Sequence, residues 1–262
     1  MNKSFIMDKS NKIVLFLTAC IDPSKTNNLS WHKLNDSKIR LCQYLEALKF
    51  FIENTNLPIL FVDNSGYDLS DNKFIKDLVS SGRLEIISYF ASEEIRLKGK
   101  GQGELDIIRY AMDNSEFIKH AEYIIKITGR VKINNIKDLI KTTINLGLKD
   151  KKRKYVIGER LFKADYIQSY FFIAHKDFFN TDFFIQMSNI SETPQKLVMF
   201  EECLYDSVKN WTKNGGKWHN LYHPIAIEGI KGNGEKYYPG TVRYAGIKTI
   251  INAVMANIFK YF

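Results

Sequence analysis

KIVLFLT, residues 12–18, is a continuous apolar run that ends in a small polar residue. Such a run is typical of a strand that is buried on both faces, as in a parallel sheet. Apolar residues then recur at helical spacing over 39–52, and a second apolar run, PILFVD, follows at 58–63. Strand, helix and strand within roughly fifty residues predict a right-handed βαβ unit.

The same alternation continues along the rest of the chain. Further strands are predicted over 84–89, 121–127, 155–158 and 170–174, and helices over 74–79, 104–114, 177–187 and 194–209. No internal repeat or linker interrupts the pattern. We therefore expect a single α/β domain over 1–262, Rossmann-like, with a mostly parallel sheet flanked by helices.

Composition limits the class of protein. The chain has 262 residues, of which 45% are hydrophobic and 26% charged, and this is enough for a sizeable core. Its three cysteines, Cys20, Cys42 and Cys203, are too far apart for a CxxC metal site and indicate no disulfide framework. There is no secretory signal pattern and no apolar run of about eighteen residues. A cytoplasmic protein is the expectation.

A formal net charge of +9 favours anionic partners: nucleic acid, an anionic membrane surface or a phosphate-bearing small substrate. A lysine-rich composition without functional meaning explains the charge equally well. Nucleic acid is not expected as a partner, because the aromatic residues fall inside apolar runs and no RNA- or DNA-binding motif is present.

Ligands of open α/β sheets bind at the carboxyl ends of the strands. Alternation along the fourth strand places residues 126, 128 and 130 on the same face. The strand ends supply these candidate binding residues: Thr18, Ala19, Asp63, Asn64, Lys126, Thr128, Gly129 and Arg130.

A glycine-rich stretch, KGKGQG at 98–103, precedes the helix predicted from 104. Gly101 and Gly103 would let the backbone approach an anion closely, and the helix start offers unpaired N–H groups. Lys98 and Lys100 add the positive charge that a diphosphate needs. A plain surface loop is the alternative.

The order of these elements resembles that of the GT-A glycosyltransferases. A glycine-rich loop comes first, a helix follows, and then a strand ends in Thr128-Gly129-Arg130. The Lys-x-Thr-Gly-Arg strand end is similar to that of a bacterial capsule and lipopolysaccharide transferase subset. The resemblance implies a GT-A-like fold in which residues 10–135 bind a nucleotide-diphosphate sugar. Residues 136–240 would form an elaborated half that binds a surface-polysaccharide or lipopolysaccharide acceptor, as a glycan or lipid-linked glycan.

The chain departs from this family at the metal site. GT-A enzymes usually place an Asp-x-Asp pair there to hold Mn²⁺ or Mg²⁺ under the diphosphate, and here the strand ends without a carboxylate pair. Arg130 and Lys126 are expected to bind the phosphate oxygens instead. No metal ligand is predicted, dependence on Mn²⁺ or Mg²⁺ stays open, and Arg130 paired with a structural carboxylate is the alternative.

An inverting transferase needs a carboxylate that takes the proton of the acceptor hydroxyl. Glu201 and Glu202 lie on a predicted helix in the second half, where the family often carries such an acid. Adjacent helical residues point about 100° apart, so only one of them faces a site. Asp165 is the second choice, and a solvated helix face is the alternative.

The last residues, 241–262, carry an apolar stripe and are predicted to form an amphipathic helix. This helix packs on its own domain or lies on an anionic membrane, which would place the protein peripherally at the inner face of the cytoplasmic membrane. His219 and His223 are four residues apart, but Pro224 and the lack of a third ligand make a metal site there unfavourable. A nucleotidyltransferase-like sugar-nucleotide enzyme and a basic nucleic-acid-binding protein remain as alternative functions.

Overall fold

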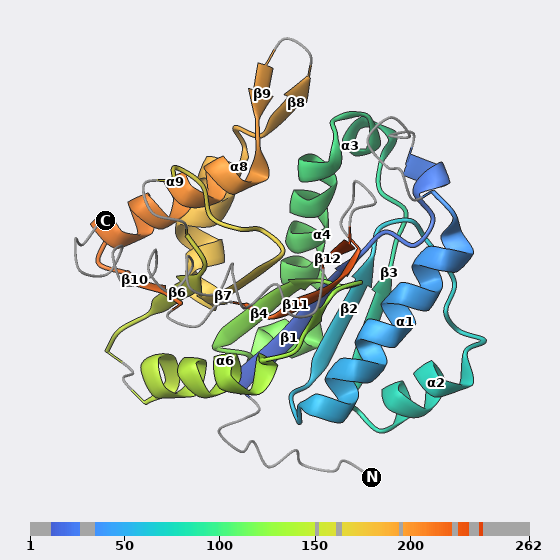
Figure 1. Ribbon diagram of the computed structural model, residues 1–262. Helices are drawn as coiled ribbons and strands as arrows, with labels where there is room; N and C mark the ends of the chain where they lie inside the picture. Colours follow the sequence, from blue (N-terminus) through green and yellow to red (C-terminus); the bar gives the residue numbers. More distant parts are fainter. Residues whose placement is uncertain are drawn as a thin grey trace.

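A central sheet of seven strands organises the computed structural model, which describes residues 12–26, 35–149, 152–160, 164–193, 196–221, 225–230 and 236–237 (Figure 1). The strand order is β10-β6-β7-β4-β1-β2-β3. Only β7 runs antiparallel to its neighbours, so the predicted α/β class with a mostly parallel sheet is confirmed. The strands are β1 Ile13–Ala19, β2 Ile59–Asp63, β3 Leu84–Ser88, β4 Tyr123–Thr128, β6 Tyr155–Gly158, β7 Phe171–His175 and β10 Lys217–Asn220.

Strand β1 lies at the centre of the sheet between β2 and β4, and every one of its residues is buried. Leu15 is in register with Ile59 of β2 and with Ile125 of β4. Side chains alternate between two cores: Leu15 belongs to one, and Phe16 belongs to the other. Burial on both faces explains why this stretch is uniformly apolar.

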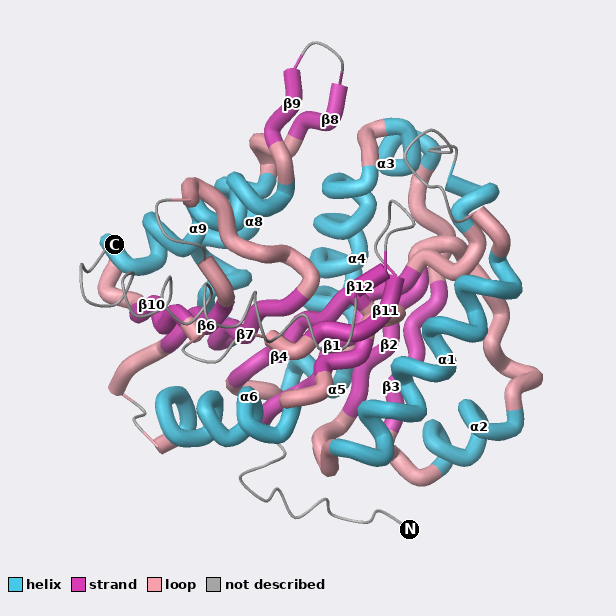
Figure 2. The backbone as a smooth tube through the Cα atoms, viewed as in Figure 1, coloured by secondary structure: helices cyan, strands magenta, loops and turns pink. Residues whose placement is uncertain are grey.

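Helices cover both faces of the sheet (Figure 2). The core that contains Leu15 is closed by α1 Ser37–Asn54, α2 Lys73–Ser80 and α6 Ile136–Thr143, which contribute residues such as Leu48, Ile75 and Leu139. The opposite core is closed by α4 Lys100–Asn114, α5 Glu116–His120 and α9 Phe200–Lys213. Asp36 caps α1 by accepting hydrogen bonds from the backbone N–H groups of Lys38 and Ile39.

Smaller elements complete the described chain. Strands β5 Lys132–Ile133, β11 Ile227–Ile230 and β12 Lys236–Tyr237 form a three-stranded sheet. A hairpin of β8 Ser191–Thr193 and β9 Lys196–Val198 projects at the top of Figure 1, beside α4. The short helices are η2 Pro23–Thr26, α3 Glu93–Leu97, α7 Lys176–Phe178 and α8 Phe184–Met187, with π-helical turns at Ile144–Leu148 and Phe179–Phe183.

Two predicted helix boundaries are wrong. The helix expected from 104 begins at Lys100, so the glycines at 101 and 103 lie in its first turn. The helix expected over 194–209 begins only at Phe200, after the β8–β9 hairpin, and its start is fixed by a hydrogen bond from the Met199 N–H to the Glu202 carboxylate. The predicted C-terminal helix over 241–262 lies outside the described residues.

Within the described part of the chain, none of the helices combines the length and the apolar character that crossing a membrane requires.

Candidate functional site

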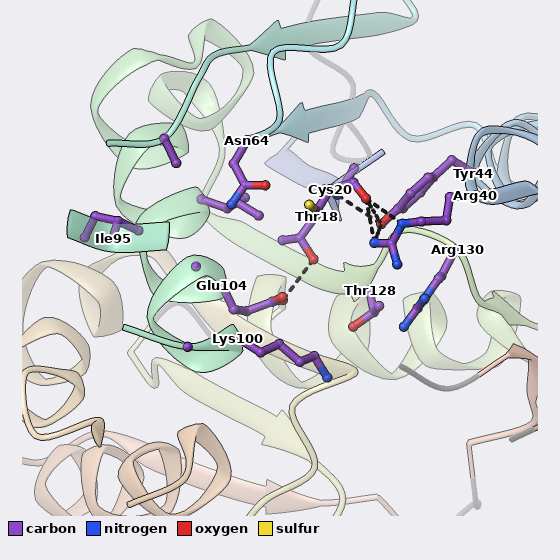
Figure 3. Close-up of a pocket in the computed structure, with 15 residues that line it drawn as sticks. Thr18, Cys20, Arg40, Tyr44, Asn64, Ile95, Lys100, Glu104, Thr128 and Arg130 are labelled. Carbon is purple, nitrogen blue, oxygen red and sulfur yellow. Dashed lines mark hydrogen bonds between the residues drawn. The ribbon is translucent and has the colours of Figure 1, made fainter. Parts of the chain in front are cut away.

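The carboxyl ends of β1, β2 and β4 meet at an open cavity, whose volume of about 640 Å³ includes solvent at its mouth (Figure 3). This cavity lies where an open α/β sheet binds its ligands. Its lining comes from the strand ends, from α1, and from α3 and α4. The residues are Thr18, Ala19, Cys20, Arg40, Tyr44, Asn64, Ala91, Ile95, Gly99, Lys100, Gly103, Glu104, Ile107, Thr128 and Arg130.

Gly129 allows the ends of β1 and β4 to approach each other. Its N–H donates to the Thr18 carbonyl oxygen at 2.9 Å, and a Cβ at this position would lie only 2.8 Å from that oxygen. Any larger residue would therefore separate the two strand ends. The glycine serves the backbone of the site and is not part of the cavity lining.

Arg40 brings a buried guanidinium to the cavity from α1. It is 3% exposed, its Nε donates to the Cys20 carbonyl oxygen at 2.8 Å, and it donates to the Tyr44 hydroxyl at 3.3 Å. The Cys20 N–H in turn donates to the Tyr44 hydroxyl at 3.0 Å. These contacts hold the guanidinium in one orientation beside the end of β1.

Three cationic side chains from separate elements thus reach one cavity. Arg40 comes from α1, Lys100 from the first turn of α4, and Arg130 from the turn after β4 (Figure 3). Arg130 is 7% exposed, whereas Lys100 is exposed at the mouth. A group with several negative charges is the ligand that such a lining favours.

Asn64 contributes a polar atom that the protein itself does not satisfy. Its side chain is 5% exposed, lines the cavity, and has an Oδ1 atom with no hydrogen-bond partner among the described residues. Leaving a buried acceptor unpaired costs roughly 1–3 kcal/mol. A ligand that offers an N–H or O–H group here would recover that free energy.

Glu104 lies at the wall of the same cavity and is ionised. It accepts a hydrogen bond from Thr18 Oγ1 at 2.9 Å and forms an ion pair with the ammonium of Lys126. Burial would raise the pKa of Glu104, but Lys126, the Lys100 ammonium and the Thr18 hydroxyl together outweigh burial and hold this pKa below its usual value.

A second, smaller cavity of about 330 Å³ adjoins the first and shares Lys100, Glu104 and Thr128 with it. It faces α9 and the β8–β9 hairpin, and its other lining residues are Gly101, Ser169, Glu192, Phe200 and Glu201. Glu201 accepts a hydrogen bond from the Ser169 hydroxyl.

Nine of the fifteen predicted site residues line these two cavities: Thr18, Ala19, Asn64, Lys100, Gly101, Gly103, Thr128, Arg130 and Glu201. A tenth, Gly129, lies at the junction of β1 and β4, outside the lining. Glu201 lines a cavity, whereas Glu202 accepts a hydrogen bond from the Met199 N–H at the start of α9. The two adjacent acids therefore point in different directions, as expected for neighbours on a helix.

The other predicted residues lie away from the lining. Asp63 is fully buried and accepts hydrogen bonds from the N–H groups of Ile21, Ser65 and Tyr67, so it shapes the loops at the ends of β1 and β2. Burial is the main cause of the raised pKa of Asp63. Lys98 forms an exposed ion pair with Glu94.

Lys126 and Asp165 are also displaced from the predicted roles. Lys126 is fully buried, so its charge neutralises Glu104 and does not reach the cavity as a phosphate ligand. The Asp165 side chain is 85% exposed, and its carboxylate Oδ1 lies 3.8 Å from a guanidinium nitrogen of Arg160.

Arg40, Glu104 and Glu192 were not predicted. Arg40 precedes Tyr44, Ala47 and Leu48 on the buried stripe of α1, and a cation on such a stripe is a signal that the sequence does contain. Glu104 likewise shares a helical face with Ile108 and Ala111. Glu192 carries no such signal, because it lies in a short hairpin far along the chain.

The residues at the end of β4 do not fit a divalent metal ion. Such ions take carboxylate, carbonyl and water oxygens, and this strand ends in Thr128, Gly129 and Arg130. Glu104 supplies the carboxylate in the lining of the first cavity, and it is already paired with Lys126. Across the described ranges, no group of three or more His, Cys, Asp or Glu side chains could hold a metal ion.

Comparisons with known proteins gave weak structural likenesses only. No protein-family model and no curated protein matches the sequence. Among solved structures, a protein from Desulfovibrio desulfuricans G20, described as a nucleotide-diphospho-sugar transferase, gives a TM-score of 0.42 with 11% identity, over 80% of this chain and 78% of that one. A glycosyltransferase involved in glycosylation of the major capsid of PBCV-1 gives 0.41 and 13%, over 80% and 82%.

The mannosyltransferase of Pyrobaculum calidifontis, solved with GDP-Man and Mn²⁺, gives a TM-score of 0.42 with 8% identity, over 80% of this chain and 54% of that one.

Proposed function

We propose that this protein is a glycosyltransferase that moves a sugar from a nucleotide-diphosphate donor to a glycan acceptor. One observation carries the proposal: Arg40, Lys100 and Arg130, from three separate elements, line one cavity at the carboxyl edge of a mostly parallel sheet. A diphosphate matches this lining in charge, and guanidinium groups bind phosphate oxygens in a bidentate manner.

The polar groups of the first cavity, which we call the donor-side cavity from here on, support a nucleotide. They are few and stand among apolar side chains such as Ile95 and Ile107, as is usual in small-molecule sites. The unpaired Oδ1 of Asn64 offers an acceptor for an N–H of the base or a hydroxyl of the ribose. The adjoining second cavity has Glu201 in its wall, and we assign it to the transferred sugar and its acceptor and call it the acceptor-side cavity from here on.

The reaction breaks the bond between the anomeric carbon and the diphosphate oxygen, and the acceptor hydroxyl oxygen forms a new bond to that carbon. The electron pair of the broken bond stays on the diphosphate, whose charge rises in the transition state. Fixed cations stabilise this charge most effectively, and we assign this role to Arg130, which lines the cavity after the end of β4. In an inverting reaction Glu201 would take the proton of the acceptor hydroxyl.

We extend the proposal to a surface-polysaccharide or lipopolysaccharide acceptor in a bacterium, with the enzyme in the cytoplasm beside the inner face of the cytoplasmic membrane. The net charge of +9 supports this location, because anionic lipid headgroups attract basic proteins. Transfer to a lipid-linked glycan in vesicles with anionic lipid, compared with neutral vesicles, tests this part.

Thermal unfolding with a panel of nucleoside diphosphates and nucleotide sugars tests the proposal itself. Each ligand is added once with EDTA and once with Mn²⁺, since a ligand that binds only the folded state raises the melting temperature. We expect one base class to raise it in EDTA. A rise in melting temperature that requires Mn²⁺ would support the transferase but would contradict the proposed role of the cationic side chains in binding the diphosphate. No shift with any nucleotide overturns the proposal.

A further inference from the structure

Lys126 is a lysine that the sheet buries completely. Its side chain is 0% exposed in β4, and its Nζ lies about 6 Å from the ring centroids of Phe172 and Phe200. Burial of an ammonium in apolar surroundings is unfavourable unless the charge is paired and hydrogen-bonded. Buried ion pairs add little net stability over apolar side chains of the same volume. Stability alone therefore does not explain this lysine.

The contacts of Lys126 lead to both cavities. On one side its ammonium pairs with Glu104, which accepts from Thr18 Oγ1 at 2.9 Å in the wall of the donor-side cavity. On the other side Nζ donates to the Ser169 carbonyl oxygen at 2.7 Å. The hydroxyl of the same serine donates to Glu201 in the acceptor-side cavity.

We propose that Lys126 is a positioning residue that fixes two carboxylates facing the two cavities, Glu104 directly and Glu201 through Ser169. The roles of the cavities rest on the proposed function, whereas the coupling between the carboxylates does not. Lys126 itself lines neither cavity, so its effect on transfer is exerted through these partners.

The charged groups around Glu104 determine how the loss of Lys126 changes the pKa of Glu104. Lys126 faces it from β4, Thr18 from β1 and Lys100 from its own helix, while Glu192 and Glu201 line the acceptor-side cavity from the hairpin and from α9. Loss of the Lys126 ammonium removes the main charge that opposes burial, so the pKa of Glu104 rises above its value in the wild-type protein. The carboxylate then requires a higher pH to be ionised, and activity that depends on it is lost at the acid side of the pH profile.

The test uses K126M, the double variant K126M/E104Q, S169A and, as a control, K12M. Lys12 pairs with Glu122, and these two residues directly precede β1 and β4, at the opposite ends of the strands from the cavities. The double variant removes the unpaired buried charge, so it separates stability from positioning. We measure melting temperature, the ¹³C carboxyl resonances of Glu104 and Glu201, and kcat and KM of transfer over pH.

We expect K126M to lower the melting temperature and the double variant to recover most of it. Turnover of the double variant stays about a hundredfold below that of the wild-type protein, because a misplaced group costs this much. K126M shows the acid limb of its pH profile at higher pH, and the Glu201 resonance moves in K126M and in S169A but not in K12M.

Recovery of both stability and turnover in the double variant would show that the pair is only structural and would overturn the proposal. An unchanged Glu201 resonance in K126M and S169A would overturn it as well. If no nucleotide sugar reacts with the wild-type protein, the proposed function fails, and the carboxyl resonances still decide the coupling.

Discussion

The carboxylate of Glu192 lies against the start of α4, where its Oε2 accepts a hydrogen bond from the Gly101 N–H at 2.9 Å. A negative group at this position satisfies an unpaired donor and interacts favourably with the helix dipole. The β8–β9 hairpin thereby closes over residues that the sequence alone presents as a loop. The glycines of this stretch provide space for a carboxylate of the protein itself.

Gly99→Ala tests this packing. Gly99 has φ of 107°, and a Cβ there would lie 2.1 Å from Glu192 Oε2, so we expect the free energy of unfolding to fall by about 1–3 kcal/mol. Gly103→Ala is the matched control. A Cβ at Gly103 meets only Asn64 Nδ2 at 3.6 Å, and alanine in a helix gains about 0.5–1 kcal/mol. Urea unfolding measures both, and equal stabilities would contradict the contact.

The strands were predictable because burial on both faces leaves a uniform apolar run, as at residues 13–17 and 59–62. The start of α4 was not predictable, because Gly101 is placed in a helix by Glu192, which is ninety-one residues away in sequence. Long-range contacts of this kind override local propensity.

The candidate site likewise contains residues whose position follows from the sequence and residues whose position depends on long-range packing. Thr18, Asn64 and Arg130 follow from the rule that ligands bind at strand ends. Asp63 and Lys126 obey the same rule in sequence, but their partners, backbone N–H groups and Glu104, are fixed only by the three-dimensional packing. The sequence therefore predicts which residues lie at the carboxyl edge of the sheet. Whether each side chain points into the cavity or into the protein interior is determined by the three-dimensional packing.

Asp63→Asn is expected to destabilise the loops at the ends of β1 and β2. The asparagine keeps one acceptor oxygen where the carboxylate receives N–H groups from Ile21, Ser65 and Tyr67, so the free energy of unfolding should fall by about 2–4 kcal/mol. Asp68→Asn, at an exposed position of the same loop, should change it by about 0.5 kcal/mol or less. Similar effects of the two substitutions on denaturant unfolding would refute the structural role of Asp63.

Glu159 gives a prediction for the pH dependence of stability. It is 9% exposed and accepts a hydrogen bond from the Tyr170 hydroxyl at 2.6 Å, and burial raises its pKa above the usual value. The folded state therefore binds the proton more tightly than the unfolded chain does, and this contribution to stability grows as the pH falls through the raised pKa.

We expect Glu159→Gln to be at least as stable as the wild-type protein near pH 8, because the amide keeps an acceptor for Tyr170 and carries no buried charge. The advantage of the variant should shrink as the pH falls toward the usual pKa of a glutamate. Urea unfolding at a series of pH values measures the difference, and an advantage that grows at low pH would have the wrong sign.

Arg130→Ala should lower the turnover of glycosyl transfer by about a hundredfold or more, the usual effect of removing a fixed group that stabilises transition-state charge. The melting temperature should change little, and Arg130→Lys should recover part of the rate, since an ammonium supplies charge without bidentate geometry. Lys98→Ala is the matched control, because Lys98 is a nearby cation of the same glycine-rich stretch that pairs with Glu94 at the surface. Steady-state kinetics of all three variants decide the matter: if Arg130→Ala retains the turnover of Lys98→Ala, the guanidinium has no part in stabilising the leaving diphosphate.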